Sequence, residues 1–241
     1  MGVRMHAKGI ARVAGLVLLV AALTIGPGPV RAAEPAAVTS ATLPCVPGQS
    51  VALPPAATEG GLPLLAALSQ RRSARAFAPD PLPLQLLADL LWAANGVNRP
   101  ETGKRTAATA HNWQNLHVYA VTAAGAFRYD PAGHALVAVK AGDLRAATGT
   151  QDFVAGTPLN LVYVSDLTKM PGVDPATDGR FYDGVHAGIV TQNVYLFAAS
   201  ADLATVVRAM VDRQALAQEL GLPDTWRVIL AQSVGYPADR P

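Results

Sequence analysis

The stretch Arg71-Arg72-Ser73-Ala74-Arg75-Ala76-Phe77 places three guanidinium groups and a hydroxyl within five residues, directly after the apolar run 62–68. A phosphate monoester carries a charge of about −2 near neutral pH, and planar guanidinium forks match it with paired hydrogen bonds. If the chain leaves a helix near Ser73, the three arginines can converge on one anion. The alternative is end-capping, because the helix macrodipole favours cations near a helix C-terminus.

The N-terminal segment is typical of an export signal. Three basic residues precede the apolar run 13–25, which is followed by Gly, Pro and the stretch Val30-Arg31-Ala32-Ala33. This layout predicts a secretory signal peptide at 1–33, and the run is too short for an ordinary membrane span. We therefore predict a periplasmic or secreted protein with no stable membrane span after cleavage. An uncleaved anchor is the alternative.

The charge balance changes when this segment is set aside. The 241 residues include 19 Lys or Arg and 17 Asp or Glu, a formal net charge of +2. Four of those cations and no acidic residue lie in 1–32, so the rest of the chain carries a net charge of −2. The basic character belongs to the export signal, and no nucleic-acid partner is predicted. The single Cys45 cannot form an internal disulfide.

The rest of the chain is long enough for one domain with a full core. Residues 34–61, rich in Ala, Pro, Thr and Gly, predict a flexible tether, and 62–241 the domain. Apolar periodicity and turn residues predict helices at 62–70, 84–95, 143–149, 181–200 and 213–220 and strands at 116–121, 126–129, 135–139, 159–164, 205–210 and 226–236. Residues 97–106 are predicted to be a loop and 107–115 a helical turn. Because strands and helices mix without a strict βαβ repeat, the fold class is α+β.

Several catalytic patterns are absent from the sequence. It holds no G-x-S-x-G, no Walker loop and no G-x-G-x-x-G opening a helix, and its five histidines lack zinc-ligand spacing. No metal is therefore predicted. Two amide pairs remain, Asn112 with Gln114 and Gln192 with Asn193, the second among apolar neighbours where amides need a partner or a ligand. Taken singly, each pair is better explained by a self-satisfied loop or by a helix face turned to water.

Taken in order, four blocks of the sequence resemble the nitroreductase-type flavoprotein family. They are the arginine stretch, the segment from Gly96 to Gln114, the segment Gly188-Ile189-Val190-Thr191-Gln192-Asn193-Val194-Tyr195-Leu196, and Val234-Gly235-Tyr236-Pro237. The resemblance covers 62–237 and is closest to a subgroup related to the azoline-oxidising, SagB-type dehydrogenases. It implies an antiparallel-dominated sheet flanked by helices, an FMN cofactor, and a homodimer with the flavin between protomers.

The resemblance also implies roles for particular residues. Arg71, Arg72, Ser73 and Arg75 would hold the FMN phosphate and ribityl chain, with Arg240 adding to the phosphate site. Asn112 and Gln114 would lie near the flavin ring or the ribityl hydroxyls. The segment Val207-Arg208-Ala209-Met210 would present backbone N–H groups to the N5/O4 edge of the flavin. No catalytic side chain is required, because the flavin carries the hydride chemistry and the protein supplies orientation and electrostatics.

The function implied is an FMN-dependent oxidoreductase that transfers hydride between a donor and a small organic acceptor, such as a nitro compound or a quinone, by a ping-pong mechanism. Export conflicts with NAD(P)H as the donor, because NAD(P)H is not normally available outside the cytoplasm. Two alternatives stay open: a non-catalytic binder of flavin or a phosphorylated ligand, and an oxygen-using dehydrogenase of the azoline-oxidase type. The chain departs from the family pattern at Ala108-Thr109, where Pro-Ser is usual, and at His186, for which the sequence indicates no functional role and favours a partly buried helix histidine.

Overall fold

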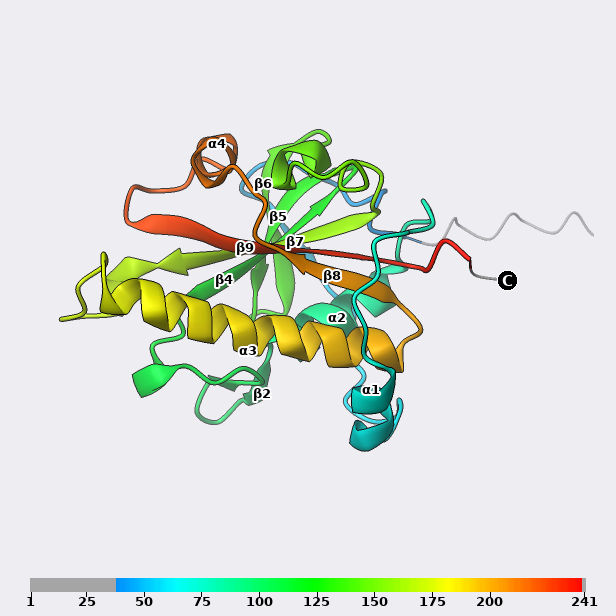
Figure 1. Ribbon diagram of the computed structural model, residues 1–241, viewed down its shortest axis with the longest axis horizontal. Coiled ribbons are helices and arrows are strands. Elements are labelled where there is room, and N and C mark those ends of the chain that lie inside the picture. The colour runs from blue at the N-terminus through cyan, green and yellow to red at the C-terminus, as the bar shows by residue number, and fades with distance from the viewer. Residues whose placement is uncertain (1–37, 240–241) are drawn as a thin grey trace, which may run out of the picture. The chain divides into compact units, whose positions relative to one another are not determined.

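A seven-stranded sheet organises residues 38–239, the part of the chain that this computed structural model describes (Figure 1). The strand order is β1-β6-β5-β4-β7-β9-β8, and every neighbouring pair is antiparallel. The strands are β1 (Ser50–Ala52), β4 (Leu116–Thr122), β5 (Gly125–Asp130), β6 (Ala135–Ala141), β7 (Leu159–Asp166), β8 (Ala204–Arg208) and β9 (Trp226–Gly235). The predicted α+β class, with an antiparallel-dominated sheet, is confirmed.

Helices cover both faces of the sheet. They are α1 (Leu64–Gln70), α2 (Leu84–Asn95), α3 (Asp178–Ser200) and α4 (Arg213–Glu219), with 3₁₀ turns η1 (Ala110–Asn112), η2 (Arg145–Thr148) and η3 (Leu167–Lys169). The long helix α3 runs along one face together with α2, and α4 lies on the other face (Figure 1). Between residues 38 and 239 the structure holds no helix long and apolar enough to cross a membrane.

Side chains that alternate between the two faces of the sheet form two hydrophobic cores. On β4, Leu116, Val118 and Ala120 pack toward α2 and α3, whereas Tyr119 and Val121 pack toward α4. Successive side chains of a strand point to opposite faces, so one strand serves both cores. The leucines of α2 show the strength of the first core, because burying each one stabilises the fold by about 1.5–3 kcal/mol. Three of them are fully buried: Leu87, Leu90 and Leu91.

The predicted flexible tether is wrong for the part of it that the structure describes. Residues 50–52 form the edge strand β1, paired with β6, and the backbone N–H of Gly48 donates to the carbonyl of Ala138. Leu43 and Leu53 belong to the larger core, with 4% and 8% of their surfaces exposed. Sparse leucines and one strand edge are enough to order this segment, although it lacks a periodic pattern. The predicted signal peptide lies outside the described residues.

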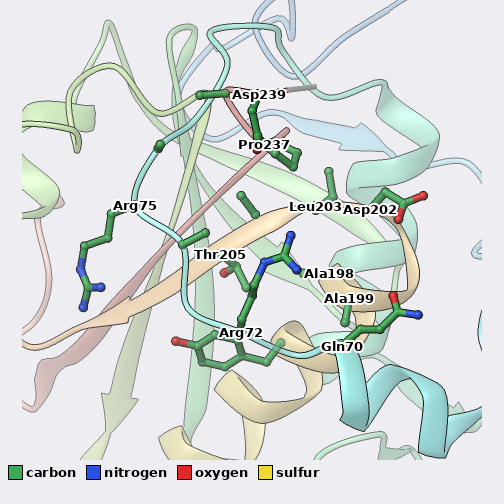
Figure 2. A pocket seen from close by; sticks show the side chains of 15 residues that line it. Gln70, Arg72, Arg75, Ala198, Ala199, Asp202, Leu203, Thr205, Pro237 and Asp239 are labelled. Carbon is green, nitrogen blue, oxygen red and sulfur yellow. The ribbon is translucent and has the colours of Figure 1, made fainter. Parts of the chain in front are cut away.

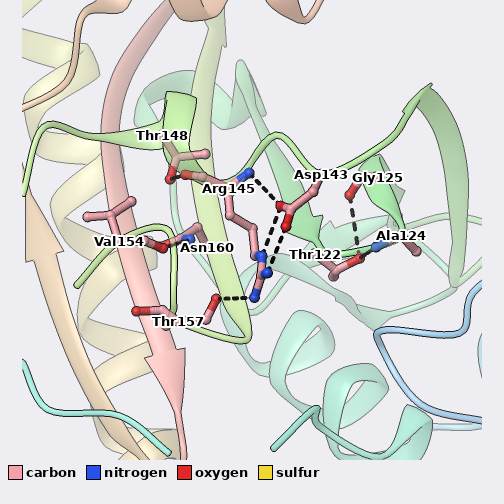
Figure 3. Close-up of polar contacts among 9 residues, drawn as sticks. All are labelled: Thr122, Ala124, Gly125, Asp143, Arg145, Thr148, Val154, Thr157 and Asn160. Atoms are coloured by element: carbon pink, nitrogen blue, oxygen red, sulfur yellow. Dashed lines mark hydrogen bonds and ion pairs between the residues drawn. The ribbon is translucent and has the colours of Figure 1, made fainter. Parts of the chain in front are cut away.

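Two local predictions are also corrected. The predicted loop at 97–106 contains the short hairpin of β2 (Val97–Arg99) and β3 (Lys104–Arg105). The predicted helix at 143–149 is only the 3₁₀ turn η2. It is held by Arg145, which pairs with Asp143 and donates to the carbonyl of Thr157 just before β7 (Figure 3). This ion pair lowers the pKa of the Asp143 carboxyl.

Candidate functional site

The arginine stretch leaves its helix as the sequence predicts. Helix α1 ends at Gln70, and Arg71 adopts an extended conformation with φ −54° and ψ 123°. The chain then lies along β8, where the backbone N–H of Ala74 donates to the carbonyl of Thr205 over 3.0 Å. Phe77 forms a β-bridge with Pro237, after the end of β9. The sheet therefore holds this segment as it would hold a further strand.

The hydroxyl of Tyr195 on α3 ties the same segment to the rest of the fold. It accepts a hydrogen bond from the backbone N–H of Val207 over 3.0 Å and lies 2.7 Å from the Ser73 hydroxyl. Either hydroxyl can be the donor in the Ser73–Tyr195 contact. The Arg71 guanidinium lies 5.3 Å from the centre of the Tyr195 ring, within the range of cation–π attraction.

A pocket of about 430 Å³ opens beside this segment, within the range of small-molecule sites. Its polar lining residues include Arg72, Arg75, Thr205, Asp202 and Asp239. Figure 2 shows the Arg72 side chain pointing into the pocket. Across residues 38–239, no hydrogen bond or ion pair engages the guanidinium of Arg72 or Arg75. Both groups are therefore available to an anion from outside the chain.

The three arginines do not converge on one point, which corrects the expected geometry. Arg71 stacks on Tyr195, Arg72 enters the pocket, and Arg75 extends on the other side of its segment (Figure 2). The reason is the extended backbone, which sends side chains to alternate sides of the segment. End-capping is not supported either, because none of these guanidinium groups donates to a carbonyl of α1 within the described residues. Arg240 lies outside them.

The side chain of Arg208 is part of the interior. It is 3% exposed and donates to the carbonyl of Thr148, to the Asn160 amide oxygen and to the Ser233 hydroxyl over 2.8–3.1 Å. Burial lowers the pKa of this guanidinium to about 10. Gly149 is required beside it, because a Cβ there would lie 1.9 Å from Arg208 Nη1. The backbone role predicted for 207–210 stays a prediction; Ala209 and Met210 are exposed.

The second predicted site, Asn112 and Gln114, lies on a strained loop. His111, Asn112 and Gln114 all have φ between 49° and 54°, in the left-handed region that costs ordinary residues free energy. The amide nitrogen of Gln114 donates to the amide oxygen of Asn112 over 3.2 Å and also to the carbonyl of Gly103. The Thr109 hydroxyl accepts from the backbone N–H of Gln114 over 2.9 Å and so links the two ends of this stretch. Strain of this kind persists only where surrounding contacts impose it, and it clusters at functional sites.

A polar group behind this loop is buried; the sequence favours a partly buried helix histidine at His186 but predicts none of its partners. His186 of α3, 1% exposed, accepts from the backbone N–H of Ala110 and lies 2.8 Å from the Asn115 amide oxygen. Asn115 is fully buried. The rings of Trp113 and Tyr182 pack around His186 at 6.3 and 5.9 Å. Only the unexpected histidine in the middle of an apolar helix could have indicated this arrangement.

Within one chain the two predicted sites lie apart. The loop contacts α3 at His186, whereas the pocket is lined by α3 residues Tyr195 and Ala198. At 1.5 Å per residue, about 18 Å of helix separates His186 from Ala198. The pair Gln192 and Asn193 lies between them; Gln192 is exposed, and Asn193 donates to the carbonyl of Ala94 at the end of α2. The two predicted sites therefore lie along different parts of α3.

Comparisons with known proteins identify the family and the fold. The Nitroreductase family matches residues 68–236. The protein named "Putative nitroreductase MJ1384" from Methanocaldococcus jannaschii is 32% identical over 158 residues, which cover 61% of this chain and 79% of that protein. A crystal structure from Ralstonia eutropha JMP134, described as a "putative nitroreductase", superposes with a TM-score of 0.74 at 38% identity over 85% of this chain and 99% of that one. The Escherichia coli microcin synthetase McbBCD complex superposes at 0.58 with 16% identity over 74% of this chain and 75% of that one, a likeness of fold alone.

Proposed function

The chain belongs to the nitroreductase family, whose members are oxidoreductases that typically bind a flavin, and we propose that this protein is an FMN-dependent oxidoreductase of small organic molecules. The observation that carries the proposal is the unpartnered guanidinium of Arg72 in the pocket beside α3. A guanidinium without a protein partner fits a phosphate, since the fork can donate two parallel bonds to it. When bound, the flavin supplies hydride transfer, so no acid or base of the chain is needed for that step.

The residues around the pocket bind and orient the phosphate end. Arg72 enters the cavity, and Arg75, which extends on the other side of the same segment, also borders it. Their backbone is fixed by the bond from Ala74 to Thr205 and by the Ser73–Tyr195 contact, so little further ordering is required on binding. Asp202 and Asp239 lie on the same lining and oppose an anion. The two arginines must therefore outweigh two carboxylates.

A homodimer would complete the site. Residues 184–200 contain no charged side chain, yet one face of this part of α3 is open to solvent. Val185 in this part is 43% exposed, and Phe181, one turn earlier on α3, is 65% exposed. An uncharged, partly apolar helix face of this kind is typical of a surface that a partner covers. We propose a second copy as that partner, so that the loop of one chain lies near the pocket of the other.

Two finer features belong to the same proposal. The ping-pong order follows if one site serves both donor and acceptor in turn. The N-terminal sequence supports export to the periplasm or beyond, which favours a donor other than NAD(P)H. The azoline-oxidising subgroup has no support beyond the likeness of fold to the microcin synthetase complex.

The first test is the visible absorbance spectrum of the purified protein, with the heat-released ligand identified by mass. Flavin bands and released FMN are the expected result. A colourless protein that also refuses added FMN would contradict the proposal. Reduction of the bound flavin by a chemical donor, followed by reoxidation with a nitro compound or a quinone, separates an oxidoreductase from a protein that only binds flavin.

The second test removes the arginines of the pocket. Arg72→Ala with Arg75→Ala should weaken FMN binding at least 100-fold, because charge-assisted hydrogen bonds are worth about 1.5–3 kcal/mol each. Lys140→Ala is the matched control: it also removes a cation, but one already paired with Glu219 on the surface. FMN affinity, measured by flavin fluorescence, should be unchanged in that variant. Full flavin content in the double variant would contradict the proposal that Arg72 and Arg75 bind the FMN phosphate.

A further inference from the structure

His186 connects α3 to the loop that carries Asn112 and Gln114. Its Nε2 lies 2.9 Å from the backbone nitrogen of Ala110, and its Nδ1 lies 2.8 Å from the Asn115 amide oxygen. Ala110 is the first residue of η1, directly before the left-handed pair His111 and Asn112. The imidazole is therefore bonded at the residue where the strained stretch begins.

The partners determine the protonation state of this imidazole. A backbone N–H can only donate, so Nε2 must accept and carries no proton. Nδ1 is then the protonated nitrogen and donates to Asn115, whose amide nitrogen faces the Ser165 hydroxyl at 2.8 Å and Asp183 at 3.3 Å. The tautomer is set by the other hydrogen bond of the ring, as is usual for histidine. Protonation of Nε2 would place two donors against each other.

The hydrogen-bonded chain from Ala110 through His186 and Asn115, which we call the relay, ends on the charged groups of Asp183 and Arg227. Both charged groups are held in place. The carboxylate of Asp183 accepts from Arg227 Nε, and Arg227 also donates to the carbonyl of Pro175 over 2.7 Å. Asp183 and Asn115 are 1% and 0% exposed. The relay therefore runs from the loop, through the interior, to β9 and the segment before α3. Apart from Arg227 Nη2, which is buried without a hydrogen-bond partner within the described residues, the groups of this chain are bonded, and a buried network of this kind has little freedom to rearrange.

We propose that His186 is a positioning residue: as a neutral imidazole it holds the loop in the left-handed conformation that orients Asn112 and Gln114, and acid releases that loop by placing a proton on Nε2. The part that concerns ligand binding rests on the proposed function, in which Asn112 and Gln114 contact the cofactor. The part that concerns the loop does not.

The groups packed around His186 decide at what acidity this happens. From α3 these are Tyr182 and the Asp183 carboxylate, from the loop Trp113, and behind Asp183 the Arg227 guanidinium. Burial lowers the pKa of His186 below its ordinary value, and the charge of Asp183 opposes that shift. The loop is therefore held near neutral pH and released as the solution becomes acidic.

The test is amide hydrogen exchange of residues 110–115 in the ligand-free protein, corrected for the intrinsic pH dependence of exchange. The wild-type chain should lose at least 10-fold in protection at these amides from about pH 7.5 to about pH 5. His186→Phe keeps a ring but has no acceptor, so its loop should be unprotected at both pH values. In His186→Gln a carbonyl can accept from Ala110 without titrating, so protection should be regained and should not vary with pH.

His134→Gln is the matched control, because His134 also has two partners, Tyr129 and the carbonyl of Pro54, but lies away from the loop. It should keep the wild-type pH profile. Wild-type protection in His186→Phe, or a pH-dependent His186→Gln, would overturn the proposal. FMN affinity is measured in parallel: if the wild type binds no FMN while the exchange pattern is as expected, the proposed function fails and the positioning role stands.

Discussion

Two segments that pack against α3 differ in how they are held. The arginine stretch, beside the C-terminal end of α3, is held by its backbone and its guanidinium groups have few partners, whereas the loop 109–115, beside the N-terminal half, is held through its side chains as well. The arginine stretch has ordinary extended geometry, and Arg72 and Arg75 have no partner within the described residues. The loop at 109–115 has three left-handed residues, and Gln114 is bonded through its backbone and its amide. Unpaired charge therefore lies beside the C-terminal end of α3, and the strained loop lies beside its N-terminal half.

The difference indicates how each end contributes to binding. Open guanidinium groups attract any anion, and salt screens that attraction. A strained loop held by buried bonds offers one shape, and it depends on the groups that impose the strain. Changes to the open side chains at the first end should alter ligand affinity with little loss of stability, whereas changes at the second end should alter stability first. The predictions below test that contrast.

The largest effect is expected from Asn115→Leu. This amide contacts His186, Ser165 and Asp183 while fully buried, so its loss leaves several polar groups unpaired. We expect the free energy of unfolding to fall by about 3 kcal/mol, measured by urea denaturation. Asn95→Leu is the control, since that buried amide makes one hydrogen bond, to the carbonyl of Leu116, and should cost about half as much. Equal losses would contradict the central role of Asn115.

Acid should act at the N-terminal end, where His117 follows the loop on β4. His117 is stacked on Trp226 at 4.2 Å, and burial, with Lys169 and Arg128 nearby, lowers its pKa to about 4. Its folded-state pKa lies below the unfolded value of about 6.5, so the stability it confers is present above pH 6.5 and is lost as pH falls toward 4. The loss should approach about 3 kcal/mol.

The variant His117→Phe tests this attribution. The ring can still stack on Trp226, but nothing titrates at this position, so the urea midpoint should depend less on pH between 6.5 and 4. His186 should preserve part of the dependence, because its pKa is also lowered. An unchanged pH profile would show that the acid sensitivity arises elsewhere.

A smaller effect is expected from Tyr195→Phe at the C-terminal end. The change leaves the Val207 N–H without its partner and frees Ser73, for a loss of about 1–2 kcal/mol of stability. FMN affinity should also fall by about 3- to 10-fold, because the arginine segment loses an anchor. Tyr163→Phe is matched to it: that buried hydroxyl donates to Gln232, so stability should fall while affinity stays unchanged.

The smallest effect is expected from Asp202→Asn. This carboxylate lines the pocket opposite an anion site, so removing its charge should tighten FMN binding by about 2- to 3-fold at low salt, and less at high salt. Asp202 has φ 52°, a conformation that asparagine also tolerates, so the backbone should not change. Asp224→Asn, an exposed acid outside the pocket lining, should leave the affinity as it is. Weaker binding in Asp202→Asn would argue against an anion in this pocket.

Much of the fold could be predicted from local pattern. The predicted helix 84–95 coincides with α2, and the strands at β4, β5, β6, β7 and β9 were each predicted to within about two residues. The prediction for residues 38–61 was wrong because Leu43 and Leu53 are too far apart to form a periodic pattern. Only contact with β6 and the core orders this segment. The alternation of side chains on β4 could also be predicted, but the face of the sheet on which α3 packs could not.

The candidate site was predictable in composition and less so in geometry. The arginine motif identified the segment that leaves α1, yet not that Arg71 would stack on Tyr195 while Arg72 enters the pocket. Arg208 shows the same limit, because an arginine in a strand pattern does not reveal that its guanidinium is buried among Thr148, Asn160 and Ser233.

The sequence by itself determined what depends on neighbouring residues: the helices and most strands, the exit of the chain from α1 at the arginines, and the ordered blocks shared with the nitroreductase family. The tertiary structure alone decided which distant groups meet. His186 and Asn115 stand 71 positions apart, and Tyr195 reaches Ser73 across 122. Periodicity reports only which face of an element is apolar, whereas a buried hydrogen bond requires two elements to pack at one register. That register became visible only once the sheet and α3 were in place.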